Sequence, residues 1–66
     1  MATPHTNSRE VLFEFTAIGT TVKVSAIDAA TGLEVSIMGP VQASRADLQR
    51  LALAKLNGRL ASHSRT

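Results

Sequence analysis

The carboxy-terminal run from Ser44 to Ser62 has the residue spacing of one amphipathic helix that must cover another element. Ser44 can accept an N–H of the first helical turn, and Asp47 can reach back toward it as in a capping box. At 100° per residue, one side of the helix collects apolar residues: Leu48, Ala52, Leu56 and Leu60. We therefore expect the rest of the chain to supply a face for this helix.

The apolar arc of the helix is wider than one sheet face needs. Leu51 lies beyond one edge of the arc, and Lys55 and Arg59 fall near its middle. We interpret this pattern as two apolar seams with a basic strip between them. Small residues also form a ridge along the helix: Ala54, Gly58 and Ala61. The ridge either admits a neighbouring helix closely or consists of helix-forming residues on a wet surface.

The end of the helix has two interpretations. Asn57 and Gly58 have the composition of a C-cap, which would leave Leu60 on a loop. A helix that continues to about Ser62 is favoured, because Leu56 and Leu60 then share one face.

Three runs before the helix alternate apolar and polar residues, as half-buried strands do: residues 10–16, 21–27 and 33–38. Gly19 lies in the first connection, and Asp28 and Gly32 bound the second, which is typical of a hairpin. Gly39-Pro40 is expected to end the third strand, since proline cannot donate to a ladder. The sequence predicts an α+β fold, a three-stranded antiparallel β-meander with one C-terminal helix on its apolar face (β-β-β-α).

Loops at 17–20 and 29–32 would fix the register of this meander. The expected neighbours in the first hairpin are Phe15 with Val22, Phe13 with Val24, and Glu14 with Lys23. Those in the second are Ala26 with Val35, and Val24 with Ile37. Apolar residues then meet apolar residues on one dry face, and the other face is wet.

One domain is expected over residues 9–62, with disordered tails at 1–8 and 63–66. A chain of 66 residues buries only about 60% of its surface, so it usually needs a further source of stability. It has no cysteine, and its two histidines, His5 and His63, lie in the expected tails without metal-ligand spacing. We expect no metal or cofactor, which leaves self-association.

No apolar run reaches the ~20 residues of a membrane span, and no basic region precedes an apolar core at the amino terminus. These features predict a cytoplasmic protein without a membrane partner.

The net charge of +2 is unevenly distributed. Residues 1–44 are acidic, whereas residues 45–66 carry five cations against Asp47 alone: Arg45, Arg50, Lys55, Arg59 and Arg65. This asymmetry indicates either a nucleic-acid face or attraction between the two halves. We favour the second, because the cations surround the helix and both aromatic residues, Phe13 and Phe15, alternate into the core.

Two small groups of residues are candidates for chemical sites. Lys23 next to Ser25 on the wet face has the composition of a nucleophile with its base, but water and Glu14 keep such a lysine charged. Ser44 and Arg45 at the helix start form a possible anion site, although capping alone explains Ser44. No catalytic residue is expected, and the protein is not expected to be an enzyme.

Several segments together resemble a short bacterial family of unknown function: Val-Leu-Phe-Glu-Phe at 11–15, Val-Lys-Val-Ser-Ala-Ile-Asp at 22–28, Thr-Gly at 31–32, Glu-Val-Ser-Ile at 34–37, Gly-Pro at 39–40 and Leu-Ala-Leu-Ala-Lys-Leu at 51–56. The resemblance covers residues 10–60. It implies a self-contained bacterial domain, and it carries no activity.

The sequence thus predicts a non-catalytic, homo-oligomeric interaction module, most simply a homodimer. Another protein is a possible partner, and weak nucleic-acid binding by the basic helix is the alternative function. The expected interaction residues are Val11, Leu51, Ala54, Lys55, Gly58 and Arg59. Strand-edge pairing and helix-to-helix contact both remain open as dimer geometries.

Overall fold

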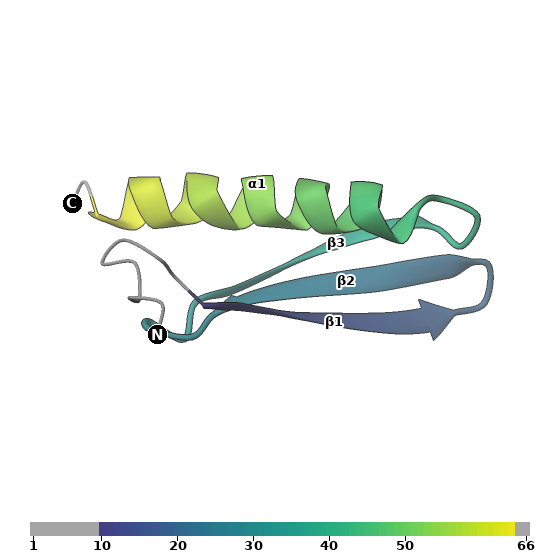
Figure 1. Ribbon diagram of the computed structural model, residues 1–66, viewed down its shortest axis with the longest axis horizontal. Helices are drawn as coiled ribbons and strands as arrows, with labels where there is room; N and C mark the ends of the chain where they lie inside the picture. Colours follow the sequence, from purple (N-terminus) through teal and green to yellow (C-terminus); the bar gives the residue numbers. More distant parts are fainter. Residues whose placement is uncertain (1–9, 65–66) are drawn as a thin grey trace, which may run out of the picture.

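The structure, a computed structural model, describes residues 10–64 and contains one sheet and one helix. The elements follow the order β1 (Val11–Ile18), β2 (Thr21–Asp28), β3 (Glu34–Pro40) and α1 (Arg45–Ser64). The strands form an antiparallel sheet in the order β1-β2-β3, and α1 lies along one face of it (Figure 1). The predicted β-β-β-α fold is confirmed. The expected tail at 1–8 lies outside the described residues, whereas residues 63 and 64 of the other tail belong to α1.

The first hairpin is tighter than the sequence indicated. Ile18 pairs with Thr21, so the connection is the dipeptide Gly19-Thr20, and Gly19 has a φ of 62°. A positive φ at the first central residue is what a type II′ turn requires, and this turn matches the twist of the flanking strands. The predicted loop at 17–20 is therefore wrong, and the register moves by two residues.

The corrected register places Phe15 opposite Val24 and Glu14 opposite Ser25. The expected pair of Glu14 with Lys23 does not form, since Lys23 lies between Thr16 and Met38. A shift of two residues leaves every side chain on its predicted face, because strand side chains alternate with period two.

The second turn is held by Asp28, as its position suggested. Its Oδ2 accepts from the N–H of Thr31 at 3.0 Å and from the Thr31 hydroxyl at 2.8 Å. Gly32 has a φ of 78° and donates its N–H to the Asp28 carbonyl at 2.7 Å. The predicted pairs Val24–Ile37 and Ala26–Val35 are confirmed.

β3 continues through the residues that were expected to stop it. Pro40 pairs with Thr21, and the N–H of Val41 donates to the Thr20 carbonyl at 3.0 Å. Hydrogen-bonded and non-bonded pairs alternate in an antiparallel ladder, so the nitrogen of Pro40 faces away from β2. A proline is tolerated there because β3 is an edge strand.

The core lies between α1 and the two strands beneath it, β2 and β3. Its buried residues are Val24, Ala26, Val35, Leu48, Ala52 and Leu56. α1 passes through Asn57 and Gly58 without a break, so the alternative of an early C-cap is wrong.

Gly39 is a position where a methyl group should destabilise the fold. A Cβ on Gly39 would lie 2.5 Å from Cδ2 of Leu48, which is buried in the core. Because overpacking a core costs about 1–3 kcal/mol, Gly39→Ala should lower the free energy of unfolding by that amount in urea denaturation.

Gly58→Ala is the matched control for this substitution. A Cβ on Gly58 meets no atom within 4 Å, and alanine is favoured over glycine in a helix by up to about 1 kcal/mol. Equal midpoints for the two variants would contradict the proposed contact with Leu48.

Candidate interaction surface

The part of the chain that the structure describes, residues 10–64, lacks two standard kinds of functional element. Within them, no group of three or more His, Cys, Asp or Glu side chains is arranged to hold a metal ion. No helix in this part of the chain is long and apolar enough to cross a membrane. The candidate functional features of the described residues are the two sheet edges and the exposed apolar surfaces.

The outer edge of β1 presents the backbone groups of its odd-numbered residues. The carbonyl of Glu10 accepts from the N–H of Ala29 at 3.0 Å, so Glu10 belongs to the hydrogen-bonded pairs with β2. Because such pairs alternate, Leu12, Glu14 and Thr16 also bond to β2. The N–H and C=O groups of Phe13, Phe15 and Ala17 therefore point away from β2, toward solvent at the open edge of the sheet. An edge of this kind is a template for another strand.

The outer edge of β3 is protected by two features. Nζ of Lys55 donates to the outward carbonyl of Ser36 at 2.8 Å, and Pro40 has no N–H to offer. Charged side chains and prolines are common means of blocking an edge strand. Lys55, an expected interaction residue, thus lies at the β3 edge. Within residues 10–64, the β1 edge has no proline and no comparable side-chain bond to an outward carbonyl.

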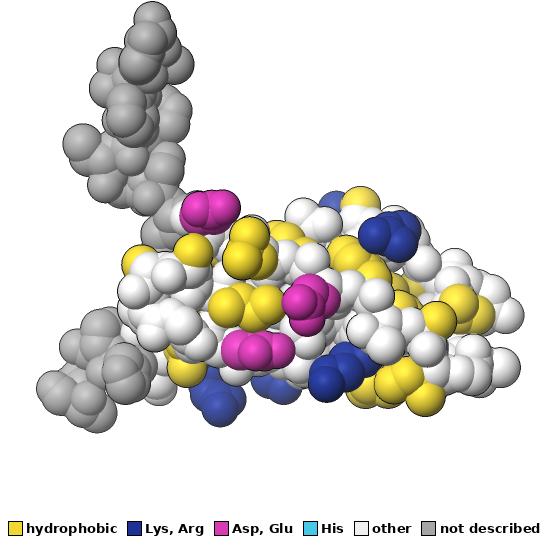
Figure 2. Space-filling view, turned by 90° about the horizontal axis from the view of Figure 1, so that it is seen from below, with side chains coloured by type: hydrophobic (Ala, Val, Ile, Leu, Met, Phe, Trp, Pro, Cys, Tyr) yellow, Lys and Arg dark blue, Asp and Glu magenta, His cyan; other side chains and the backbone are white. Residues whose placement is uncertain are grey.

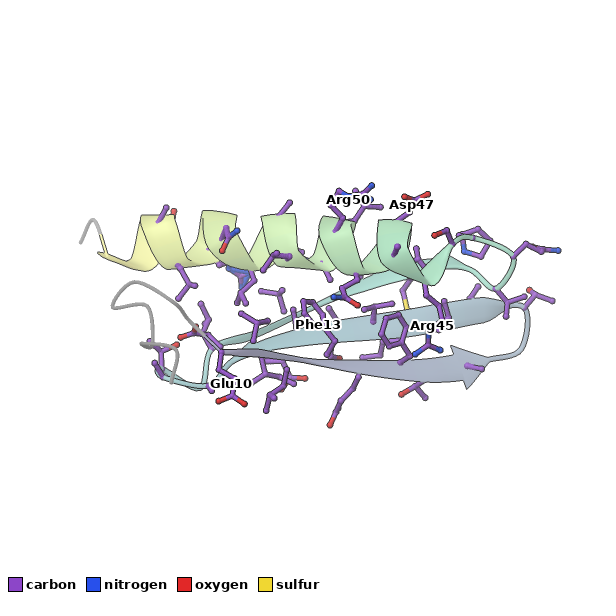
Figure 3. All side chains as sticks on the ribbon, in the orientation of Figure 1. Glu10, Phe13, Arg45, Asp47 and Arg50 are labelled. Carbon is purple, nitrogen blue, oxygen red and sulfur yellow. The ribbon has the colours of Figure 1, made fainter. Side chains whose placement is uncertain are left out.

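The side of β1 that faces the helix layer is incompletely covered. α1 packs over β2 and β3, and Val11, Phe13 and Phe15 remain half-buried. Figure 3 shows Phe13 pointing toward the helix layer and Arg45 reaching down from the start of α1, while Asp47 and Arg50 point away from the sheet. The cause is the difference in width between the two layers. Three strands spaced about 4.8 Å apart form a sheet that is wider than one helix, whose diameter is about 10 Å.

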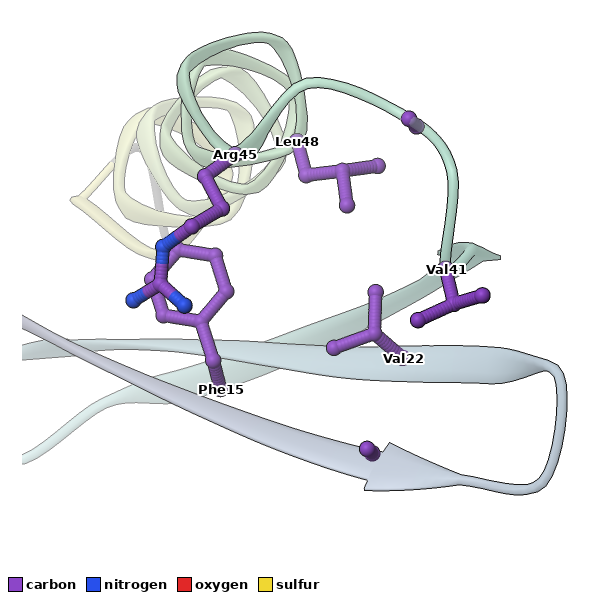
Figure 4. Close-up of a pocket in the computed structure, with 7 residues that line it drawn as sticks. Phe15, Val22, Val41, Arg45 and Leu48 are labelled. Atoms are coloured by element: carbon purple, nitrogen blue, oxygen red, sulfur yellow. The ribbon is translucent and has the colours of Figure 1, made fainter.

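A pocket of about 240 Å³ opens beside this uncovered part of β1 (Figure 4). It lies between the strand ends and the start of α1, and its lining residues are Phe15, Ala17, Val22, Val41, Ala43, Arg45 and Leu48. The guanidinium carbon of Arg45 lies 4.1 Å from the centre of the Phe15 ring, a cation–π contact. The pocket is therefore apolar, with one cation stacked on an aromatic ring at its wall.

Ser44 caps α1, as predicted, through its hydroxyl. The Asp47 N–H donates to Oγ of Ser44 at 3.3 Å. Asp47 also accepts from Arg50 at 2.9 Å, an exposed ion pair three residues apart. Of the two residues in the possible anion site, Ser44 is thus used by the helix start and Arg45 lies over Phe15.

The sheet face opposite α1 is mixed in character (Figure 2). Leu12, Ile18 and Met38 are 48%, 53% and 56% exposed, among acidic and basic side chains. Ser25 is buried here, although this face was expected to be wet, and its hydroxyl lies 3.0 Å from that of Ser36. The Ser25 hydroxyl, which the sequence places near Lys23, is therefore hydrogen-bonded to Ser36 on the neighbouring strand.

The expected interaction residues do not gather on one surface. Leu51, Ala54, Gly58 and Arg59 are exposed on α1, whereas Val11 is half-buried on the sheet. Sequence reasoning missed Phe13, Phe15 and Ala17 as accessible residues. The signal that could have found them is that one helix is narrower than three strands.

The fold and these surfaces define a small two-layer α+β domain in which, among the residues that the structure describes, the β1 edge is the less protected of the two sheet edges. The family model described as Domain of unknown function (DUF6898) matches residues 8–63, and the chain belongs to this family. The expected resemblance to a family of unknown function is confirmed. No curated protein and no solved structure matches the chain.

Proposed function

We propose that this protein is a non-catalytic, homo-oligomeric interaction module that acts as a homodimer. The observation that carries the proposal is β1, whose outward backbone groups and half-buried apolar side chains occur on the same strand. A partner on this strand would satisfy both, because a strand addition forms backbone bonds and brings side chains together on each face.

The small size of the core supports the same proposal. Among the described residues, six apolar side chains are buried, and three of these are alanine or valine on the sheet. Chains of this length usually gain further stability from a disulfide, a metal or a partner subunit, and this sequence contains no cysteine. Burial of apolar surface against a second copy provides about 25 cal/mol per Å².

Nucleic-acid binding by the basic residues of α1 finds less support. Arg45 stacks on Phe15, Arg50 pairs with Asp47, and Lys55 donates to a β3 carbonyl. These cations point to three different parts of the fold rather than to one stripe. Both aromatic rings lie on the helix-facing side of the sheet, so neither provides a stacking platform on the open face.

The experiment that tests the proposal is native molar mass, measured by light scattering on a sizing column over a concentration series. At low and at high salt, the expected mass approaches twice the 7.0 kDa of one chain, since the proposed contact is apolar and backbone-mediated. A mass of 7.0 kDa at every concentration would contradict self-association.

A further inference from the structure

We propose that β1 pairs with β1 of a second copy about a two-fold axis at Phe15, and that each Phe13 ring enters the other copy's pocket beside Ala17. This inference rests on the proposed function, because it specifies the partner strand and the contact of the dimer. It makes the pocket at the start of α1 a docking site for an aromatic side chain of the same protein.

The direction of the backbone groups limits the possible pairings. Phe13, Phe15 and Ala17 carry the outward N–H and C=O groups, so odd-numbered residues must face odd-numbered residues in the hydrogen-bonded pairs. An antiparallel pair about a two-fold axis perpendicular to the sheet then has its centre at a single residue. It also keeps both helices on the same side of a six-stranded sheet.

Chemical matching of the side chains selects among these centres. A centre at Glu14 places the two Glu14 carboxylates directly opposite each other, which is destabilising. A centre at Phe13 places the exposed Leu12 opposite Glu14 of the second copy, so an apolar side chain faces a carboxylate and gains no apolar partner.

A centre at Phe15 places no two like charges opposite each other and no carboxylate opposite an apolar side chain. Leu12 then faces Ile18, Phe13 faces Ala17, Glu14 faces Thr16, and Phe15 faces Phe15. The two side chains that are 48% and 53% exposed on the open sheet face, Leu12 and Ile18, cover each other in this register. Aromatic and apolar cross-strand pairs contribute about 0.2–1 kcal/mol each.

This register also brings a ring to the pocket. Ala17 lines the pocket and carries only a methyl group, so the space next to it on the helix-facing side is open. Phe13 of the second copy lies across the edge from Ala17 on that same side. A cavity of about 150 Å³ holds a benzene molecule, so a pocket of about 240 Å³ has room for a phenyl ring. Arg45, already 4.1 Å from the Phe15 ring centre, would then contact a second aromatic face.

Pairing through β1 excludes the helix-to-helix geometry. α1 packs on β2 and β3, so each helix axis lies about two strand spacings from the dimer axis. With strands about 4.8 Å apart, the two helices are about 19 Å apart, whereas packed helices are about 8–10 Å apart. The ridge with Ala54 and Gly58 therefore does not take part in this dimer.

Disulfide trapping tests the register, because the native chain has no cysteine. Leu12→Cys and Ile18→Cys are prepared separately with tags of different length, shown to be dimeric by light scattering, mixed and oxidised. Leu12 and Ile18 would form a non-hydrogen-bonded pair with Cα atoms about 4.5 Å apart, a separation that a disulfide spans. Both side chains are about half exposed and lie outside the buried core, so the substitutions leave the core intact.

The expected result is a disulfide between the two different variants and little bonding within either one. Glu14→Cys is the control for register, since it would bond to itself only if the axis lies at Glu14. Bonding of Glu14→Cys to itself or to Leu12→Cys would overturn the proposed register. Dimers that form no disulfide with any of these variants would overturn edge pairing while leaving the homodimer intact, and monomers would contradict the proposed function itself.

Discussion

Leu56→Ala is expected to lower the free energy of unfolding by about 2–5 kcal/mol, which is enough to unfold much of a domain of this size. Leu56 is fully buried, and its side chain lies in the centre of the contact between α1 and the sheet. Its removal leaves a cavity that the neighbouring buried valines and alanines are too small to fill. Circular dichroism during urea titration measures the effect at a fixed protein concentration.

The control for this prediction is Leu51→Ala on the same helix. Leu51 is 59% exposed, so the same truncation should change the free energy of unfolding by no more than about 0.5 kcal/mol. If Leu51→Ala proves as destabilising as Leu56→Ala, then the Leu51 surface of α1 is buried in the native assembly and the proposed dimer is wrong.

Ala17→Leu is expected to weaken the dimer about 30-fold or more while leaving each protomer folded. A leucine at this exposed position would occupy the space next to the pocket and exclude Phe13 of the second copy. Loss of a buried aromatic anchor costs about 2 kcal/mol or more in binding. Sedimentation equilibrium gives the dissociation constant, and circular dichroism verifies the fold.

Ala54→Leu makes the same chemical change on the small-residue ridge of α1, which is the alternative interface. Ala54 is exposed on α1, and in the proposed dimer it lies away from the second copy. The dissociation constant of Ala54→Leu should therefore match that of the native chain. A dimer that is weakened by Ala54→Leu and unaffected by Ala17→Leu would identify the helix ridge as the interface.

Much of the fold follows from local patterns in the sequence. The alternation in residues 10–38 and the spacing of Leu48, Leu56 and Leu60 predict the elements and their faces. Asp28 and Gly32 predict the second turn, because a side-chain cap and a positive φ occur together there. The pairing of β2 with β3 follows from that turn.

The sequence predictions for the first turn and for the end of β3 were wrong because two local structures are compatible with the same residue pattern in each case. Gly19 permits either a loop at 17–20 or a two-residue turn, and both keep each side chain on its face. Pro40 stops a central strand but not an edge strand, and only the strand order distinguishes the two cases.

The exposed surface of β1 could not be derived from residue periodicity. It depends on the lateral position of α1, which lies over β2 and β3 because Leu48 and Leu56 pack against those strands. The protection of β3 by Lys55 likewise depends on a contact between residues 19 positions apart. Both features depend on tertiary contacts rather than on local sequence, and together they make β1 the edge available for pairing.

The most direct test of the β1 edge as the site of self-association is amide hydrogen exchange, measured by NMR at protein concentrations below and above the dissociation constant of the dimer. The N–H groups of Leu12, Glu14 and Thr16 should exchange slowly at both concentrations, because they bond to β2 within one chain. Those of Phe13, Phe15 and Ala17 should exchange rapidly in the monomer and slowly in the dimer. Rapid exchange of these three groups in a sample shown to be dimeric would contradict pairing through β1.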